Sequence, residues 1–147
     1  MSFSIRRAVI TDIGAMFHIR TSVRENAMSY RALIAAGITP GWVAHLLDGR
    51  GAGWIAHADM EEAGFVLADA KVGRIFALFV LPQHEGKGIG RALLRPAEEW
   101  LAKQGWREIW LETGADPKLR AAGFYRRMGW QEDGIATNGQ RRFRRSL

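Results

Sequence analysis

The sequence contains no cysteine, which excludes disulfide bonds, thiolate metal sites and a cysteine nucleophile. Long apolar runs are also missing. The longest, residues 75–81, is much shorter than the roughly 18 apolar residues that cross a bilayer. The first residues show no apolar signal core either. These absences predict a cytoplasmic protein that does not use a membrane as its partner.

What remains is the composition of an ordinary globular domain. The chain has 147 residues, of which 48% are hydrophobic and 24% charged. A domain of about 100–150 residues is long enough to bury its own core. No internal repeat or Pro/Gly/Ser-rich linker divides the sequence. We therefore expect one domain over residues 1–147.

The net charge of +6 is distributed unevenly. Residues 1–73 have as many acidic as basic side chains, so the whole excess lies in residues 74–147. A nucleic acid, an anionic small molecule or a merely solvated face would each explain it. Nucleic-acid binding is not expected, because no aromatic platforms are interleaved with the basic residues and no reading helix is evident. The densest cluster, Arg141–Arg145, is predicted to be a solvated edge strand.

In the first half, the alternation of Ile5, Arg7 and Val9 predicts a short strand, and Thr11-Asp12 a helix start. Two short helices are expected over residues 30–36 and 40–48, the second with Thr39 as N-cap before Pro40. Three strands over residues 54–59, 64–70 and 74–81 follow with short connections, which predicts an antiparallel meander. The third is apolar on both faces, as is typical of a central buried strand.

The second half begins with a glycine-rich turn and a helix in which Leu93, Leu94, Ala97 and Leu101 keep helical spacing. Pro96 predicts a kink or an irregular stretch. A strand over residues 108–113 follows, giving one βαβ crossover. Asp116-Pro117 is expected to open the next helix, and Gly129 to close it. Its expected inner face is Ala121, Phe124, Tyr125 and Met128. Two strands over residues 130–136 and 141–145, joined through Asn138-Gly139, end the chain.

The turn over residues 83–91 joins a buried strand to a helix. Glycines there allow close approach of a ligand, and the free N–H groups of the first helical turn favour a phosphate or pyrophosphate. Neither the P-loop nor the dinucleotide fingerprint fits the spacing of Gly86, Gly88 and Gly90. The alternative is a turn that needs glycine only for its own geometry.

Two segments are similar to motifs of one family. Residues 80–94 contain Gln83, Gly86 and Gly88 in the pattern (Gln/Arg)-x-x-Gly-x-(Gly/Ala), and residues 120–130 form a helix that ends in an aromatic pair followed by Gly-aromatic. The first resembles the acyl-CoA-binding motif of the GNAT superfamily of N-acyltransferases, and the second resembles another motif of that family. The likeness in layout spans most of the chain.

The resemblance implies an α/β fold with a mixed sheet that contains the meander and splays into a V-shaped cleft for acyl-CoA. It implies an acetyl-CoA-dependent N-acetyltransferase in which a primary amine, of a small molecule or a protein, attacks the thioester directly in a ternary complex. No metal is expected. The alternative is a non-catalytic acyl-CoA-binding or anion-binding module of the same fold. The acceptor, the acyl chain length and a homodimer remain open.

By the same resemblance, the pyrophosphate would rest on the N–H groups of Glu85–Arg91, and the pantetheine arm would pair with residues 75–80. The expected cofactor-binding residues are Leu78, Phe79, Val80, Gln83, His84, Glu85, Gly86, Lys87, Gly88, Ile89, Gly90, Arg91, Thr113 and Tyr125. Tyr125 is also the expected proton donor to the thiolate. Glu25 is the expected base, with His84 and a water chain as alternatives.

Three residues depart from the family pattern. Lys118 stands where many relatives have asparagine, and Glu85 stands where many have arginine. Arg74 occupies the neighbourhood in which some relatives carry a glutamate base. Glu85 therefore brings a negative charge close to the expected phosphates.

Overall fold

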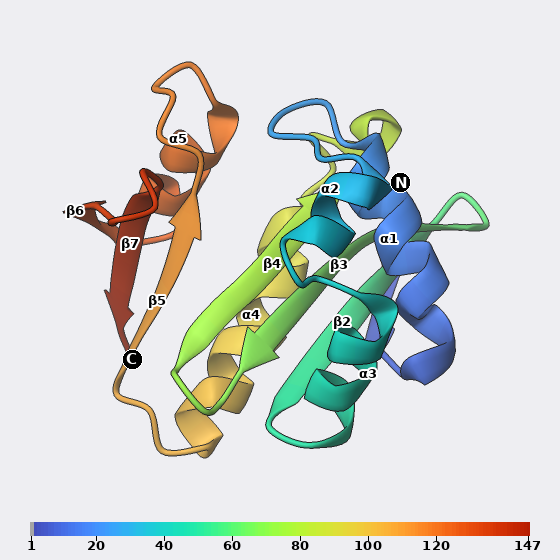
Figure 1. The fold of residues 1–147 in the computed structure, drawn as a ribbon, viewed down its shortest axis with the longest axis horizontal. Coiled ribbons are helices and arrows are strands. Elements are labelled where there is room, and N and C mark those ends of the chain that lie inside the picture. The colour runs from blue at the N-terminus through green and yellow to red at the C-terminus, as the bar shows by residue number, and fades with distance from the viewer. Residues whose placement is uncertain (1) are drawn as a thin grey trace.

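A computed structural model describes residues 2–147 and contains a seven-stranded mixed sheet of order β1-β2-β3-β4-β5-β7-β6 (Figure 1). The strands are β1 (Phe3–Arg7), β2 (Gly51–Ala58), β3 (Glu61–Asp69), β4 (Arg74–Val80), β5 (Glu108–Thr113), β6 (Gln131–Ile135) and β7 (Arg141–Ser146). The helices are α1 (Ile13–Ser22), α2 (Tyr30–Ala35), α3 (Pro40–Asp48), α4 (Ile89–Lys103) and α5 (Arg120–Arg127), with short 3-10 turns at Ile10–Asp12 and Pro82–His84. The predicted fold class is confirmed.

Helices cover both faces of the sheet (Figure 1). Helices α1–α3 pack on one face of β2–β4, where their apolar side chains form one core cluster with Ile55 and Phe65. Helix α4 packs on the opposite face, and its Leu93 and Leu101 join a second cluster that continues to Ile109 and Phe143 of β5 and β7. The predicted meander is confirmed, because β2, β3 and β4 pair antiparallel in sequence.

The sheet splays between β4 and β5. In the described residues these parallel strands pair only at Arg74 and Trp110. The closed end of the splay is held by the indoles of Trp106 and Trp110, which donate to the carbonyls of Ala70 and Val72 at 2.7 and 2.9 Å. Beyond this point β4 lies half-buried along an open edge. The prediction of a fully buried β4 is therefore wrong, because its neighbour diverges.

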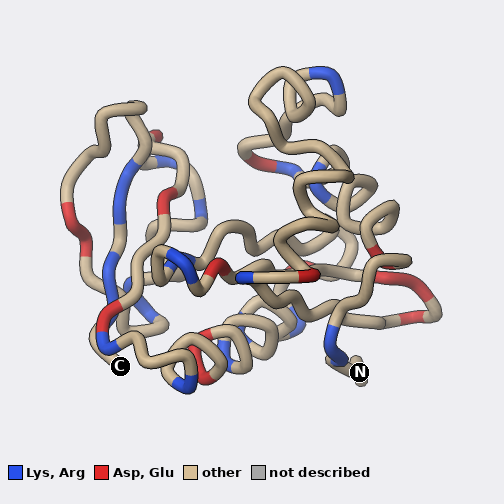
Figure 2. The backbone as a smooth tube through the Cα atoms, turned by 60° about the horizontal axis from the view of Figure 1, so that its bottom comes forward, with Lys and Arg blue, Asp and Glu red and all other residues tan. Residues whose placement is uncertain are grey.

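Strand β7 is not the edge strand that its arginines predict. It pairs with β5 on one side and with β6 on the other, so β6 forms the edge. Phe143 of β7 is fully buried, whereas every residue of β6 is exposed. Acidic side chains of the neighbouring strands, such as Glu108 and Glu132, form ion pairs with the arginines of β7 (Figure 2). These pairs allow a basic strand to occupy an interior position in the sheet.

Two helices bear on the expectations from proline. Helix α4 continues through Pro96 without an irregular stretch, because buried side chains on both sides of the proline hold it against the sheet. Helix α5 begins at Arg120 rather than at Asp116-Pro117, because Asp116 folds into a turn in which its carboxylate accepts the N–H of Lys118. Within residues 2–147 the structure has no helix with the length and apolarity of a membrane span.

Candidate active site

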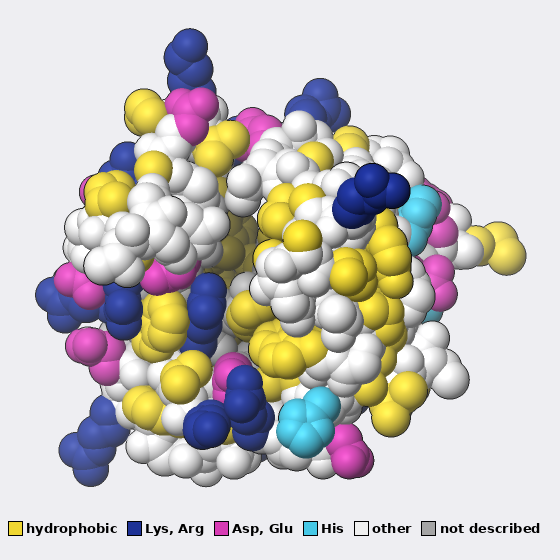
Figure 3. Space-filling view, viewed as in Figure 1, with side chains coloured by type: hydrophobic (Ala, Val, Ile, Leu, Met, Phe, Trp, Pro, Cys, Tyr) yellow, Lys and Arg dark blue, Asp and Glu magenta, His cyan; other side chains and the backbone are white. Residues whose placement is uncertain are grey.

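A cleft of about 460 Å³ lies where the sheet splays. Its walls come from the open edge of β4, the loop into α4, the end of β5, helix α5 and the segment after α1. Figure 3 shows the hollow between the two parts of the molecule, with hydrophobic side chains on its walls and basic side chains nearby. A V-shaped cleft at this position was predicted.

The glycine-rich loop forms one end of the cleft. Gly86 and Gly88 have φ of 78° and 85°, and a Cβ added at either would meet no protein atom within 4 Å. The first hydrogen bond of α4 runs from Ala92 N to Gly88 O, so the N–H groups of the preceding residues are not used within the helix. The space beside these donors suits an anionic group.

The residue at the start of this loop, His84, is buried rather than solvated. Its Nε2 lies 2.6 Å from the Glu61 carboxylate, and its Nδ1 lies 2.9 Å from Nζ of Lys87. Gln83 also donates to Glu61, and Lys87 pairs with Asp59 at 3.0 Å. The hydrogen bond from His84 lowers the pKa of Glu61. This network fastens the loop to the β2–β3 turn and directs the side chains of Gln83 and Lys87 away from the cleft.

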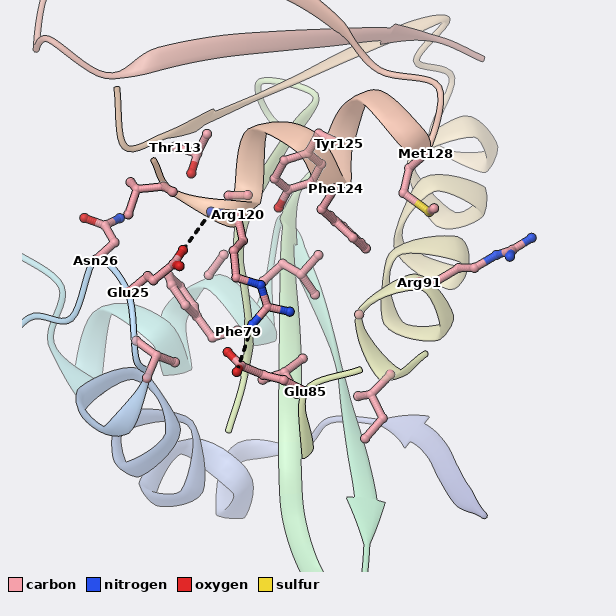
Figure 4. Close-up of a pocket in the computed structure, with 18 of the residues that line it drawn as sticks. Glu25, Asn26, Phe79, Glu85, Arg91, Thr113, Arg120, Phe124, Tyr125 and Met128 are labelled. Carbon is pink, nitrogen blue, oxygen red and sulfur yellow. Dashed lines mark hydrogen bonds and ion pairs between the residues drawn. The ribbon is translucent and has the colours of Figure 1, made fainter. Parts of the chain in front are cut away.

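Glu85 is neutralised by two arginines at the mouth of the cleft. Its carboxylate lies 2.9 Å from Nη1 of Arg120 and 3.3 Å from Nε of Arg24. The three residues come from the glycine-rich loop, α5 and the segment after α1, and Figure 4 shows the Arg120 contact. The two guanidinium groups therefore offset the negative charge of Glu85.

Tyr125 projects its hydroxyl into the cleft from α5 (Figure 4). Its ring is buried among Phe124, Trp130 and Phe143, with centroids 5.1–5.9 Å away. Burial, and secondarily the charge of Glu98, raises the pKa of this hydroxyl well above its usual range. The hydroxyl is therefore protonated at neutral pH and is available as a hydrogen-bond donor.

Glu25 lies at the rim of the cleft but is not free. Its Oε2 accepts the backbone N–H of Arg120 at 2.8 Å, at the first residue of α5 (Figure 4). A carboxylate at this position satisfies one of the donors at a helix start and interacts favourably with the helix dipole. Glu25 thus fixes the helix that carries Tyr125, across 95 positions of sequence.

Most of the residues expected from the sequence come together in the cleft. The ones that line it are Glu25, Leu78, Phe79, Val80, His84, Glu85, Gly86, Gly88, Ile89, Gly90, Arg91, Thr113 and Tyr125. Gln83 and Lys87 lie outside the lining, and the exposed guanidinium of Arg91 extends away from Tyr125 (Figure 4). Lys118 is exposed, outside the lining.

Sequence reasoning missed several lining residues. They include Arg24, Asn26, Glu112, Arg120 and Phe124. Phe124 and Arg120 belong to the second motif, so their positions on α5 were a usable signal. Arg24 and Asn26 follow α1 in a segment without a motif. Glu112 lies in a strand whose pattern gives no functional signal. Among the described residues, no three His, Asp or Glu side chains are grouped as metal ligands.

Comparison with known proteins gives one family. The family model described as "Acetyltransferase (GNAT) family" matches residues 16–130. An uncharacterized N-acetyltransferase of Methanocaldococcus jannaschii is 31% identical over 101 residues, which cover 63% of this chain and 44% of that protein. Streptothricin acetyltransferase of Streptomyces lavendulae is 41% identical over 82 residues, covering 53% of this chain and 43% of that protein. The matches thus span less than half the length of these relatives.

Solved structures with the same fold are also similar over the whole chain. The PaiA N-acetyltransferase of Thermoplasma acidophilum, solved with coenzyme A, superposes with a TM-score of 0.83 at 18% identity and covers 100% of both chains. The ribosomal-protein-S18-alanine N-acetyltransferase of Escherichia coli gives 0.74 at 20% identity, over 99% of this chain and 94% of the other. At these identities the likeness establishes the fold alone.

Proposed function

The chain belongs to the GNAT family of acetyltransferases, and from this premise we propose that it transfers the acetyl group of acetyl-CoA to a primary amine within a ternary complex. The observation that carries the proposal is the position of Tyr125. Its protonated hydroxyl points into the same cleft that the glycine-rich loop closes at one end. A binding module would need the loop but not the hydroxyl.

The cleft offers acetyl-CoA two kinds of contact. The N–H groups at the start of α4, from about Glu85 to Arg91, would hold the pyrophosphate. The open edge of β4 would pair with the pantetheine arm as an added strand does. A backbone N–H near Phe79 or Val80 would polarise the thioester carbonyl. The guanidinium groups of Arg24 and Arg120 support a polyanionic ligand at this end.

The transfer itself needs little from the protein beyond alignment and proton movement. The amine nitrogen bonds to the acetyl carbon, the carbon–sulfur bond breaks, and Tyr125 gives the departing thiolate its proton. The amine must lose a proton, and Glu25 is the proposed acceptor. Because Glu25 also holds the N-terminus of α5, its two contributions have to be separated by experiment.

Thiol release tests the proposed activity directly. Purified protein is incubated with acetyl-CoA and a panel of amines, and free thiol is followed over time. Release that requires an amine supports the enzyme. Tight binding of acetyl-CoA without release in any combination would instead support the alternative of a non-catalytic acyl-CoA-binding module.

Two substitutions at one position separate the contributions of Glu25. Glu25→Gln retains an oxygen that can accept the Arg120 N–H but cannot accept a proton at neutral pH, whereas Glu25→Ala removes both. If Glu25 is the base, Glu25→Gln and Glu25→Ala should lose activity to the same extent, and the acidic limb of the pH–rate profile should disappear. If Glu25→Gln retains activity and Glu25→Ala loses it, Glu25 is a positioning residue only.

A further inference from the structure

A second cavity of about 170 Å³ adjoins the cleft. Asn26, Phe76, Ala77, Phe79 and Glu112 line both spaces, so the two lie against the same part of β4. Resting on the proposed function, we propose that this cavity binds the acceptor, and that the acceptor is a free amino acid with an apolar side chain about the size of one ring.

The inner walls of the cavity are apolar. They are formed by Met16, Phe17, Met28, Leu33, Ile38, Val43, Phe65 and Leu67. Most of these side chains belong to the core cluster under α1–α3. A dry cavity of about 150 Å³ with such walls accommodates one benzene ring. The size and lining therefore favour an apolar group such as a phenyl or a branched alkyl side chain over a long polar chain.

Two arginines line the cavity, Arg20 beside Phe79 and Arg74 at the start of β4. Nη1 of Arg20 donates to the carbonyl of Asn26 at 2.8 Å, and its guanidinium lies 4.2 Å from the centre of the Phe79 ring. The guanidinium of Arg74 lies 4.6 Å from the ring of Trp110. Burial lowers the pKa of both side chains, a sign that their charges have lost part of their hydration.

Arg74 has capacity for a further anionic partner. Its Nη2 lies 3.6 Å from Glu112, beyond ordinary hydrogen-bond length, and its Nε is buried without a partner among residues 2–147. A carboxylate that approaches the Nη end of the guanidinium can accept from two of its N–H groups at once. With two arginines and one glutamate, the lining of the cavity carries a net positive charge, which favours a carboxylate and disfavours a polyamine.

Glu112 supplies the complementary contact for the amino group. Its side chain is 9% exposed and lines both the cavity and the cleft, beside the open edge of β4. An α-amino acid carries its carboxylate and amino group two bonds apart on one carbon. In the proposed pose, the carboxylate binds Arg74 and the amino group faces Glu112. The side chain then enters the apolar cavity, and the nitrogen faces the cleft.

A matched series of amines tests the acceptor class. L-Phenylalanine, L-phenylalaninamide and phenethylamine share the ring and the amine, but only the first has a free carboxylate. We expect kcat/KM for phenylalanine to exceed that for the other two by roughly 10–100-fold, the range for hydrogen bonds to charged groups. 1,5-Diaminopentane should be a poor acceptor. Equal or better use of phenethylamine or the diamine would overturn the proposal.

Substitutions at Arg74 test whether this side chain causes the preference for a free carboxylate. Arg74→Gln should abolish the preference for phenylalanine while the kcat/KM of phenethylamine stays within a few-fold, and Arg74→Lys should recover part of the preference. Arg107→Gln, the same charge change at an exposed side chain, is the control. A preference that persists in folded Arg74→Gln protein would contradict the assignment of Arg74.

Product binding keeps this inference separate from the proposed function. Calorimetry with N-acetyl-L-phenylalanine and N-acetylphenethylamine, in the presence of coenzyme A, requires no turnover. Selective binding of the first compound, lost in Arg74→Gln, would uphold the cavity assignment even if no amine released thiol from acetyl-CoA. Thiol release without any such selectivity would uphold the activity and overturn the acceptor class.

Discussion

The two parts of the sheet on either side of the Arg74–Trp110 pair are built in opposite ways. Strands β2 and β3 are buried along almost their whole length between helices on both faces. Strand β6 is exposed throughout, and β7 fully buries only Phe143 among its arginines. The first part is held mainly by apolar packing, and the second by ion pairs around one aromatic cluster.

This difference explains the role of the arginines in β7. Arginines of β7 pair with Glu98, Glu108, Glu132 and Asp133, so the densest basic cluster of the chain is structural. The aromatic cluster in the same part holds Tyr125 rigidly at the cleft. The first part thus supplies the rigid wall on which β4 lies, and the second supplies the charged and protonated groups that face it.

The largest expected effect comes from a comparison of Tyr125, beside the second part of the sheet, with Tyr30, beside the first part. Tyr125→Phe removes one hydroxyl while its ring packing remains, and turnover should fall by roughly 10²–10⁴-fold, the range for a general acid. Acetyl-CoA affinity should change far less, because the hydroxyl acts on charge that develops in the transition state. Steady-state kinetics at saturating acetyl-CoA measures the first quantity, and calorimetry measures the second.

Tyr30→Phe is the control in the first part. That ring packs edge-to-face on Phe17 at 5.5 Å and is about half exposed, so turnover should be unchanged. Intact turnover in Tyr125→Phe, together with weaker acetyl-CoA binding, would assign Tyr125 to ligand positioning and leave the proton to water.

The second prediction compares the two ends of α4, the helix that joins the parts. Gly88 and Gly105 have φ of 85° and 100°, and an added Cβ meets nothing within 4 Å at either. Valine at either position should cost about 1–3 kcal/mol of backbone strain. Only Gly88→Val places side-chain atoms in the cleft, so it alone should weaken acetyl-CoA binding, by roughly a hundredfold.

Calorimetry on both folded variants measures this difference. Equal affinity in Gly88→Val and Gly105→Val would show that the glycine-rich loop is needed only for its own turn, which is the alternative that its sequence left open.

The same contrast explains which features the sequence could predict. The meander, α3 with its Thr39 cap and the glycine-rich loop depend on local patterns, and the structure has them. Asp116-Pro117 was a misleading local signal, because Asp116 forms a turn of its own and the first N–H of α5 is bound by Glu25, which is 95 positions away. The interior position of β7 likewise depends on acids from other strands. Long-range partners of charged groups leave no local pattern.

For the site, most of the predicted residues line the cleft, but the pairing of charges was missed. Glu85 brings a negative charge to the expected phosphate site, and its ion pairs with Arg24 and Arg120 offset that charge. From the sequence, Arg74 was only a departure from the family's glutamate base, whereas in the structure it lines the second cavity with Glu112. Both pairings arise where the splay brings separate segments together, which periodicity does not report.

The third prediction concerns adjacent arginines of β7. Nη1 of Arg145 donates to the carbonyl of Met128 at 2.7 Å, near the end of α5, whereas Arg144 makes looser ion pairs at 3.4 and 3.9 Å. Arg145→Gln should lower the free energy of unfolding by roughly 1–2 kcal/mol, since a hydrogen bond from a partly exposed cation is lost. Arg144→Gln should cost about 0–0.5 kcal/mol.

Urea unfolding of both variants provides the comparison. Equal losses would mean that β7 is held by its overall charge rather than by the individual contact with α5.

The smallest expected effect concerns the acid at the mouth of the cleft. Glu85→Gln removes a negative charge beside the proposed phosphate site and releases Arg24 and Arg120 from their ion pairs. Exposed ion pairs contribute about 0–1 kcal/mol, so acetyl-CoA affinity should rise by no more than roughly fivefold. The gain should shrink as salt is raised from 0.05 to about 0.5 M, because added ions screen the phosphate contacts. Glu108→Gln makes the same charge change beside Arg144, outside the lining of the cleft, and should leave affinity unchanged. A loss of affinity in Glu85→Gln would mean that Glu85 positions the two arginines for the ligand, so that the ion pairs are part of the binding site rather than competitors for it.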